Sequence, residues 1–337
     1  MYDNLKTLCN LDATSGDEKT VRDYIISKID GFCDFKTDNL GNIIAFKKGK
    51  KTPQRKIMID AHMDEVGLII TNITKDGYLK FVTVGGIEVS AQMSRKVLIN
   101  GNINGVISGK PVHLIGKDER KKPPKQESLY IDIGVNSREE AEKYVNLGDR
   151  AVICGEFIEQ QNGNIISKAI DDRAGCAILI DLLTNDSEYD FYASFSVQEE
   201  VGQGGAKVSA YKINPDFAII LESTTAADIA GVTEEKTVCN IGCGPVVSFM
   251  DKYTVYDREL YTAAINSGIP CQTKRAVAGG NNSGVVHMTR EGVRSIALSV
   301  PCRYIHSSSS VANCEDIENT KKLAVYMLNA IANGEIK

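Results

Sequence analysis

The stretch Lys56-Ile-Met-Ile-Asp-Ala-His-Met-Asp-Glu65 is an apolar, β-rich run that ends in a histidine and two acids. Because side chains alternate along a strand, His62 and Asp64 lie on one side of an extended chain. A metal-bound imidazole commonly donates its second ring N–H to a carboxylate, and Asp64 is placed to accept it. Two interpretations follow: His62 is a metal ligand oriented by Asp64, or the pair is an ordinary hydrogen-bonded strand end.

The residues around this strand alternate between strand and helix patterns. Ser15-Gly-Asp-Glu18 has the form of a capping box, which predicts a helix over residues 17–30. A second helix is expected at residues 173–183. Strands are expected at residues 42–46, 191–197, 217–221 and 295–300. This alternation predicts an α/β fold with a mixed sheet that is built from both ends of the chain.

The middle of the chain has a different pattern. Turn pairs such as Asp76-Gly77 and Asn104-Gly105 separate short β-type runs. We predict that residues 67–167 form an inserted, small, barrel-like β domain. Residues 1–66 and 168–337 then form the α/β domain.

The composition excludes several classes of protein. The chain has 337 residues, with 39 Lys and Arg against 44 Asp and Glu, and so a net charge of −5. This balance offers no basic surplus for nucleic acid, and no apolar run approaches the roughly 18 residues of a membrane span. Nine cysteines without a C-x-x-C pair are expected to be reduced thiols. Since the start has no leader-like pattern, we expect a cytoplasmic protein that binds neither nucleic acid nor membranes.

Pairs of acids stand where predicted strands end. Asp171 and Asp172 lie at a strand-to-helix turn, where helix capping explains one acid and leaves the other able to bind a metal. Glu199 and Glu200 follow the strand at 191–197, and two like charges beside a buried strand end are disfavoured unless a cation is present. Neighbours on an extended chain point in opposite directions, so one glutamate can bind metal while the other faces substrate.

Two further residues extend this pattern, because Glu222 follows the strand at 217–221 and His306 follows the strand at 295–300. All the candidates lie at or after the carboxyl ends of predicted strands, the edge where open α/β sheets bind their ligands. They are His62, Asp171, Glu199, Glu200, Glu222 and His306. Two imidazoles with three or four carboxylates suit zinc, cobalt or manganese, and they exceed what one tetrahedral ion needs. We therefore predict two divalent metal ions.

Seven motifs, spread over essentially the whole length, make the chain resemble a known family, the dinuclear metal aminopeptidases that assemble into tetrahedral, or TET, particles. These motifs are Ala61-His-Met-Asp-Glu-Val-Gly67, Val84-Gly-Gly-Ile87, Gly109-Lys-Pro-Val-His-Leu114, Ile131-Asp-Ile-Gly134, Asp171-Asp-Arg173, Gln198-Glu-Glu-Val-Gly202 and Cys302-Arg-Tyr-Ile-His-Ser307. The family contains glutamyl, leucyl and deblocking aminopeptidases, and some of its members have been labelled cellulases.

The resemblance implies roles for the candidate residues. One metal would be held by His62, Asp171 and Glu222. The other would be held by Asp171, Glu200 and His306, so that Asp171 bridges the two metals and Glu199 is left as the general base. The resemblance also implies that the insertion is a dimerisation domain and that dimers close into a hollow tetrahedral dodecamer.

Two positions depart from the family pattern. Glu222 stands where aspartate is more usual, although ligation is still expected. Asn281 and Asn282, in Gly279-Gly-Asn-Asn-Ser-Gly284, stand where relatives often have Thr-Asp, so an amide replaces an acid near the expected site.

We expect a metal-dependent aminopeptidase that removes N-terminal residues from short peptides. Metal ions lower the pKa of bound water towards about 7, which supplies hydroxide, and Glu199 would pass the water proton to the leaving amine while Asp64 orients His62. Two alternatives stay open: a dinuclear-metal amidohydrolase that deacylates N-acyl amino acids, and a catalytically inactive assembly protein of the same fold. Cellulase activity is disfavoured because glycosidases generally use two separated carboxylates rather than acids bound to metals.

Overall fold

Strand β3 (Ile57–His62) lies in the middle of a large mixed sheet in the computed structural model, which describes residues 1–116, 122–277 and 279–336. Every residue of β3 is buried, as expected of a strand that is covered by helices on both faces. It runs parallel to β12 (Phe191–Ser196) and to β13 (Phe217–Thr225), and β13 runs parallel to β16 (Arg294–Arg303). The carboxyl ends of these strands therefore meet at one edge of the sheet.

Antiparallel strands flank this parallel centre on both sides. They are β1 (Asp34–Thr37) and β2 (Ile43–Lys47) next to β12, and β17 (Ser310–Asn313), β11 (Asn164–Ser167) and β10 (Ile158–Glu159) beyond β16. The short strands β14 (Val246–Val247) and β15 (Gln272–Thr273) extend the sheet from β16. The sheet is therefore mixed, as the sequence predicts.

Alternate side chains of β3 enter two hydrophobic cores. Ile57, Ile59 and Ala61 belong to the core formed with helices α1 (Tyr2–Asn10), α2 (Lys19–Ile29), α5 (Ile170–Thr184) and α9 (Cys314–Ala332). Met58 belongs to the core on the other face, formed with α6 (Gly204–Ile213) and α8 (Ser283–Val286). Helix α7 (Arg258–Ile265) packs against α9. No helix in the described residues is both long enough and apolar enough to cross a membrane.

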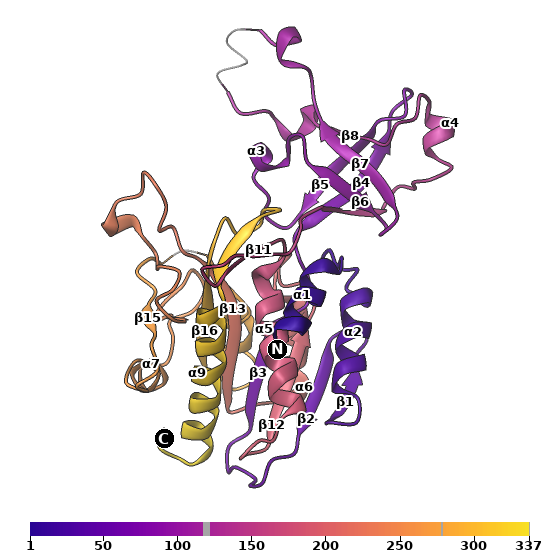
Figure 1. Ribbon diagram of the computed structural model, residues 1–337. Helices are drawn as coiled ribbons and strands as arrows, with labels where there is room; N and C mark the ends of the chain where they lie inside the picture. The colour runs from indigo at the N-terminus through magenta and orange to yellow at the C-terminus, as the bar shows by residue number, and fades with distance from the viewer. Residues whose placement is uncertain (117–121, 278, 337) are drawn as a thin grey trace.

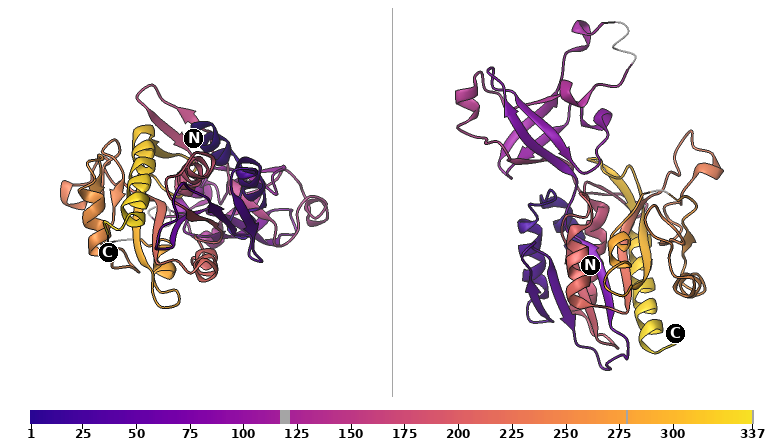
Figure 2. Two further views of the ribbon diagram at one scale, coloured as in Figure 1. Left: turned by 90° about the horizontal axis from the view of Figure 1, so that it is seen from below. Right: turned by 180° about the vertical axis from the view of Figure 1, so that it is seen from behind.

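The middle of the chain closes into a barrel with a core of its own. Neighbouring strands around it are β4 (Gly67–Ile73), β5 (Leu79–Val84), β8 (Tyr130–Asp132), β7 (Ile103–Ser108), β6 (Lys96–Ile99) and β9 (Arg150–Ile153). Leu68, Phe81 and Ile131 are among the residues that fill it. The short segments around the barrel include α3 (Val89–Gln92), α4 (Arg138–Ala141) and the 3-10 turns η1 (Val112–Leu114) and η3 (Gln126–Ser128). Figure 1 and the right view of Figure 2 show the barrel as a lobe beyond one end of the α/β lobe, which confirms the predicted fold class.

Three details differ from the sequence-based expectation. Helix α2 begins at Lys19, and Glu18 at its N-cap makes no side-chain capping hydrogen bond. Strand β13 continues to Thr225, since it stays paired with β16 as far as Cys302, so Glu222 lies inside the strand. The predicted insertion of residues 67–167 includes β10 and β11, which pair with the large sheet through β17. The division into domains stays a prediction.

Candidate metal centre

Two histidine side chains approach the same aspartate from different elements. His62 lies at the end of β3, and His306 lies in the loop that follows β16. The Nε2 atom of His62 lies 3.3 Å from Oδ1 of Asp171, and the Nε2 atom of His306 lies 3.3 Å from Oδ2 of Asp171. Asp171 therefore presents one carboxylate oxygen to each imidazole.

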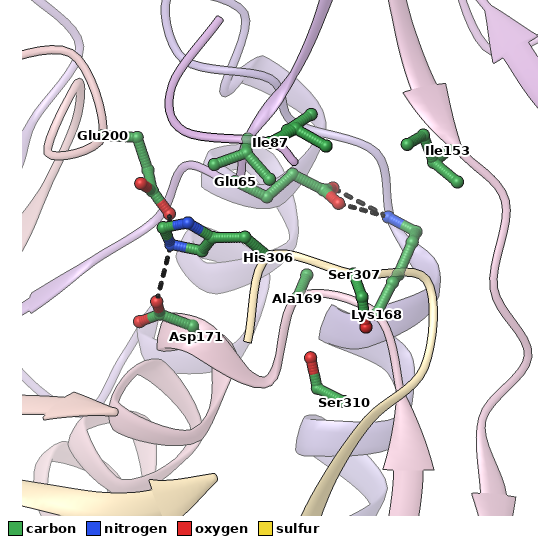
Figure 3. A pocket seen from close by; sticks show the side chains of 11 residues that line it. Glu65, Ile87, Ile153, Lys168, Ala169, Asp171, Glu200, His306, Ser307 and Ser310 are labelled. Carbon is green, nitrogen blue, oxygen red and sulfur yellow. Dashed lines mark hydrogen bonds and ion pairs between the residues drawn. The ribbon is translucent and has the colours of Figure 1, made fainter. Parts of the chain in front are cut away.

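Two glutamates complete this arrangement. The Oε1 atom of Glu222, inside β13, lies 3.4 Å from Nε2 of His62. The Oε1 atom of Glu200, in the turn after β12, lies 3.0 Å from Nε2 of His306, and Figure 3 shows this imidazole between Glu200 and Asp171. The site thus consists of two groups that share Asp171.

Both imidazoles are held at their other ring nitrogen. The Nδ1 atom of His62 lies 3.1 Å from the backbone oxygen of Asp64, and Nδ1 of His306 lies 2.8 Å from the backbone oxygen of Gly86. Because a carbonyl oxygen can only accept, Nδ1 carries the proton in each hydrogen bond. The Nε2 atom of each ring then faces the acids, and it is the nitrogen that would bind a metal once it has lost its proton.

Asp64 contacts other groups besides His62, the partner that the sequence predicts for it. Its carboxylate lies 3.4 Å from Nδ1 of His62 and accepts hydrogen bonds from the backbone N–H groups of Glu199, at 3.0 Å, and Glu200, at 3.2 Å. The Oγ atom of Ser15 donates another at 2.6 Å. Burial by itself raises the pKa of Asp64, but the hydrogen bonds from His62, Ser15 and Glu199 outweigh it and lower this pKa. Asp64 therefore ties β3 to the turn that carries both glutamates.

The predicted capping box at Ser15 and Glu18 is wrong. Ser15 donates to Asp64, and Oε1 of Glu18 accepts hydrogen bonds from the backbone N–H groups of Gly16, at 2.6 Å, and Gln198, at 3.2 Å. The sequence pattern suits a helix start, but Asp64 after β3, Gln198 after β12 and the nearby Gly16 N–H replace the helix N–H groups as hydrogen-bond partners. The two side chains instead brace the turn that carries Glu199 and Glu200.

The two acids of the Asp171-Asp172 pair have different surroundings. Asp172 is fully buried, and its Oδ1 accepts a hydrogen bond from the backbone N–H of Gly175 at 2.9 Å, as a helix-capping residue does. Asp171 lies between the imidazoles. Asp172 nevertheless comes close enough to ligate, since ligand atoms of His62, Asp172 and Glu222 lie within 4.8 Å of one another. The sequence predicts one capping acid but gives no sign that this acid also reaches the site.

The site holds more negative charge than its own residues neutralise. Asp172 Oδ2 and Glu222 Oε2 are buried without a hydrogen-bond partner among the described residues, and Asp171 Oδ1 faces the His62 imidazole at 3.3 Å. The pKa values of Glu200, Glu222 and Asp172 are raised, mainly because these carboxyl groups are buried. Burial lowers the pKa of His306, but Asp171 and Glu200 outweigh it and raise this pKa to about 11. Buried carboxylate oxygens without partners, next to two oriented imidazoles, fit divalent cations.

Glu199 lines a pocket beside Asp171. Its Oε1 atom accepts a hydrogen bond from Nε2 of Gln203 at 3.2 Å. Burial, together with the charges of Glu200 and Asp171, raises the pKa of Glu199 to about 8, against the lowering effect of His62. Bound cations would offset the neighbouring carboxylates and lower this pKa, and a carboxylate at this place in the pocket can take up and return a proton.

The segment after β15 builds another wall of this pocket. Lys274, which is 7% exposed, lines the pocket together with Gly279, Gly280 and Asn281. Burial lowers the pKa of Lys274, and the neighbouring charges of Asp251 and Glu222 oppose this effect. Nothing in the sequence singles out Lys274, because a lysine after a strand of two residues carries no pattern of its own.

The amides that depart from the family pattern are bound to buried acids. The Nδ2 atom of Asn282 donates to Oδ2 of Asp60 at 2.7 Å, and Nδ2 of Asn281 donates to Oδ2 of Asp251 at 3.3 Å. Asp60 lies on β3, two residues before His62, and is fully buried. Asp60 of β3 thus places a carboxylate next to position 282, where this chain has an amide in place of the acid that is frequent in relatives.

Known proteins match this chain over nearly its whole length. The sequence profile of the family described as M42 glutamyl aminopeptidase matches residues 41–323. A glutamyl aminopeptidase from Lactococcus lactis is 32% identical over 100% of this chain and 99% of its own length. A lysyl aminopeptidase from Pyrococcus furiosus is 32% identical over 98% of this chain and 97% of its own length. Among solved structures, the Pyrococcus horikoshii TET1 peptidase is 32% identical and superimposes with a TM-score of 0.83 over 97% of this chain and 98% of its own. That peptidase can assemble into a tetrahedron or a large octahedral shell.

Proposed function

Because this chain belongs to the family of M42 glutamyl aminopeptidases, and is therefore a metal-dependent aminopeptidase, we propose that it uses two divalent cations and a glutamate base to shorten peptides from the N-terminus. The position of Asp171 carries this proposal, because its carboxylate offers one oxygen to each of two oriented imidazoles. A single cation would leave one of the two groups around Asp171 without a charge partner.

Each cation takes three ligands from the chain in this proposal. His62, Asp171 and Glu222 hold one cation, and Asp171, Glu200 and His306 hold the other. This set of nitrogen and oxygen ligands suits zinc or cobalt, with manganese as an alternative. When bound, the cations lower the pKa of a water molecule towards about 7 and polarise the peptide carbonyl. Their charge also offsets the three ligand carboxylates, which explains how so many acids can share a buried site.

Glu199 is the general base of this proposal. It takes a proton from the attacking water and returns it to the leaving amine. Its position is held at two points, since Gln203 donates to its carboxylate and Asp64 accepts from its backbone N–H. Asp64 is therefore a positioning residue for both His62 and Glu199.

Lys274 favours substrates with an acidic N-terminal residue. Its ammonium group belongs to a buried side chain in the wall of the pocket that Glu199 and Glu222 also line. A cation with little solvent around it attracts a carboxylate more strongly than an exposed one does. Of the two specificities named for the relatives, glutamyl and lysyl, a buried lysine in the pocket wall fits the glutamyl one.

The barrel is the surface through which chains pair, and the resulting dimers close into a tetrahedral dodecamer. This part of the proposal draws on the TET1 peptidase, which is similar over 98% of its own length and can assemble into a tetrahedron. A cytoplasmic location stays a prediction.

Hydrolysis of aminoacyl reporters by the chelator-stripped chain, restored separately with zinc, cobalt or manganese, tests the proposal. We expect metal-dependent release from glutamyl and aspartyl reporters, weaker release from leucyl and lysyl reporters, and none from N-acetylated ones. Turnover of N-acetyl amino acids alone would instead support a deacylase. No turnover with any metal or substrate would support an inactive assembly protein.

The Glu199→Gln variant tests the base in the same assay. The amide keeps the size of the side chain but cannot accept the proton, so kcat should fall by about 10²- to 10⁴-fold. Cation content, measured by elemental analysis after gel filtration, should stay at two per chain. Wild-type activity in this variant would contradict the assigned role.

A further inference from the structure

We infer that the barrel takes part in the metal centre, because the backbone oxygen of Gly86 positions the imidazole of His306. Gly86 follows β5 of the barrel, whereas His306 follows β16 of the large sheet, 220 residues further along the chain. The Nδ1–H group of His306 donates to the Gly86 oxygen at 2.8 Å, and Nε2 of the same ring faces Asp171 and Glu200. The inference rests on the proposed function, since it takes His306 as a cation ligand.

The Gly86 carbonyl is attached to the barrel on both sides. Val84, the last residue of β5, pairs with Gly67 of β4 within the barrel. Ile87 packs against the hydrophobic core of the barrel, and Figure 3 shows its side chain in the pocket that His306 also lines. A shift of the barrel relative to the large sheet would therefore move the group that orients His306.

The loop approaches the site this closely because residue 85 is a glycine. Gly85 has a φ of +80°, a conformation that other residues rarely adopt. A Cβ atom there would lie 2.7 Å from Cγ1 of Val66 and 3.3 Å from Cβ of Glu200. The loop thus passes against the side chain of Glu200, which shares a cation site with His306 in the proposed function.

His306 needs this support more than His62 does. The side chain of His62 is 1% exposed, whereas that of His306 is 30% exposed and belongs to a loop. An exposed imidazole on a loop can adopt more orientations, so it loses more conformational entropy when it ligates a metal. This loss is smaller if its second ring nitrogen is already hydrogen-bonded. Loss of an outer partner of a metal-binding histidine typically weakens the metal about 10- to 100-fold. Gly86 is therefore a positioning residue for the His306 site and not for the His62 site.

Cobalt titration of the full-length, chelator-treated chain tests this inference, because cobalt absorption reports binding without turnover. The Gly85→Ala variant adds a Cβ atom against Val66 and displaces the loop that carries the Gly86 oxygen. We expect one of the two binding steps to weaken by about 10- to 100-fold and the other to stay at its wild-type affinity. The weakened step should be the one that His306→Ala removes, and not the one that His62→Ala removes.

Two further variants separate this effect from backbone strain and from unfolding. Gly134, also in the barrel, has the same φ of +80°, but a Cβ atom there meets nothing within 4 Å. The Gly134→Ala variant should therefore bind both cobalt ions as the wild type does. The double variant Gly85→Ala/Val66→Ala removes the closest clash and should recover part of the lost affinity, which a misfolded chain would not do.

The outcomes are distinguishable from a failure of the proposed function. Wild-type cobalt binding by Gly85→Ala, or equal weakening of both steps, would overturn the positioning role while leaving the ligand set intact. If His306→Ala itself leaves cobalt binding unchanged, His306 is not a ligand, and the proposed ligand set is overturned together with this inference.

Discussion

Lys274 gives the pocket a test of specificity at the scale of one residue. Replacing it with methionine keeps the unbranched side chain except for its terminal ammonium group and removes the charge that would bind an acidic substrate. A hydrogen bond to a charged group contributes about 1.5 to 3 kcal/mol, so kcat/KM for a glutamyl reporter should fall by about 10- to 100-fold in Lys274→Met. The value for a leucyl reporter should change by less than about 3-fold, since an apolar side chain makes no use of the charge.

Lys252→Met is the matched control for this prediction. Lys252 is an exposed lysine whose backbone N–H donates to the backbone oxygen of Gly279, at the edge of the same pocket. Its substitution changes the net charge by the same amount and should leave the ratio of the two kcat/KM values unchanged. A similar loss of glutamyl activity in both variants would mean that charge acts at long range and that Lys274 is no specificity residue.

Single residues of the site divide into those that the sequence indicates and those that it cannot. The candidate ligands could be found because imidazoles and acids at strand ends have few structural explanations, and the structure brings all of them together around Asp171. Asp64 was predictable as a partner of His62. Its bonds to the N–H groups of Glu199 and Glu200 were not, because they depend on how β3 and β12 align. Gly86 lies in the motif Val84-Gly-Gly-Ile87, but it contacts His306 through its backbone oxygen, and a pattern of residue types assigns no role to a backbone oxygen.

At the scale of elements, Glu65 joins three segments that meet next to the site. It follows β3, and its carboxylate accepts hydrogen bonds from Lys168, at 2.7 and 2.9 Å, from Arg173 in α5, at 3.2 Å, and from the backbone N–H of Ala13, at 3.2 Å. Glu65→Gln leaves the fully buried Arg173 without its carboxylate partner. Removing one partner of a buried ion pair costs about 3 to 5 kcal/mol, so urea denaturation of this variant should show a loss of that size.

An exposed ion pair supplies the comparison for this loss. Lys6 and Glu159 lie 3.0 Å apart with side chains that are 54% and 67% exposed. Because solvent screens such pairs, Glu159→Gln should lower the free energy of unfolding by no more than about 1 kcal/mol. Equal losses in the two variants would show that Glu65 contributes no more than a surface charge.

Helices and strands were predictable where a local sequence pattern determines them. The prediction failed where the hydrogen-bond partners come from distant strands. The parallel strands of the sheet and the turn-rich barrel follow from alternation and turn pairs, which are properties of short segments. Ser15 and Glu18 have the pattern of a capping box, but both side chains bind groups from other elements. Strands β10 and β11 join the large sheet through β17, which comes about 150 residues later in the chain, and no local pattern marks that pairing.

At the scale of the whole molecule, the proposed cations would connect segments from both ends of the chain. Their ligands come from β3, the turn after β12, β13, α5 and the loop after β16, and the Gly86 carbonyl adds the barrel. Ligands that bind only the folded state stabilise it, by about 2.7 kcal/mol per site at a hundred times the dissociation constant. Chelator should therefore lower the thermal midpoint of the wild-type chain, and added cobalt should restore it.

Asp171 makes this stabilisation a test of the shared ligand. An asparagine offers one oxygen in place of two and carries no charge, so Asp171→Asn should weaken both cation sites and lose most of the rise in thermal midpoint that cobalt gives the wild type. His62→Ala and His306→Ala each affect one site and should keep about half of that rise, whereas Glu199→Gln, which replaces no ligand, should keep all of it. Thermal scans of the four variants with chelator and with cobalt measure these differences. If Asp171→Asn loses no more of the rise than either histidine variant, Asp171 serves one cation and the dinuclear proposal is wrong.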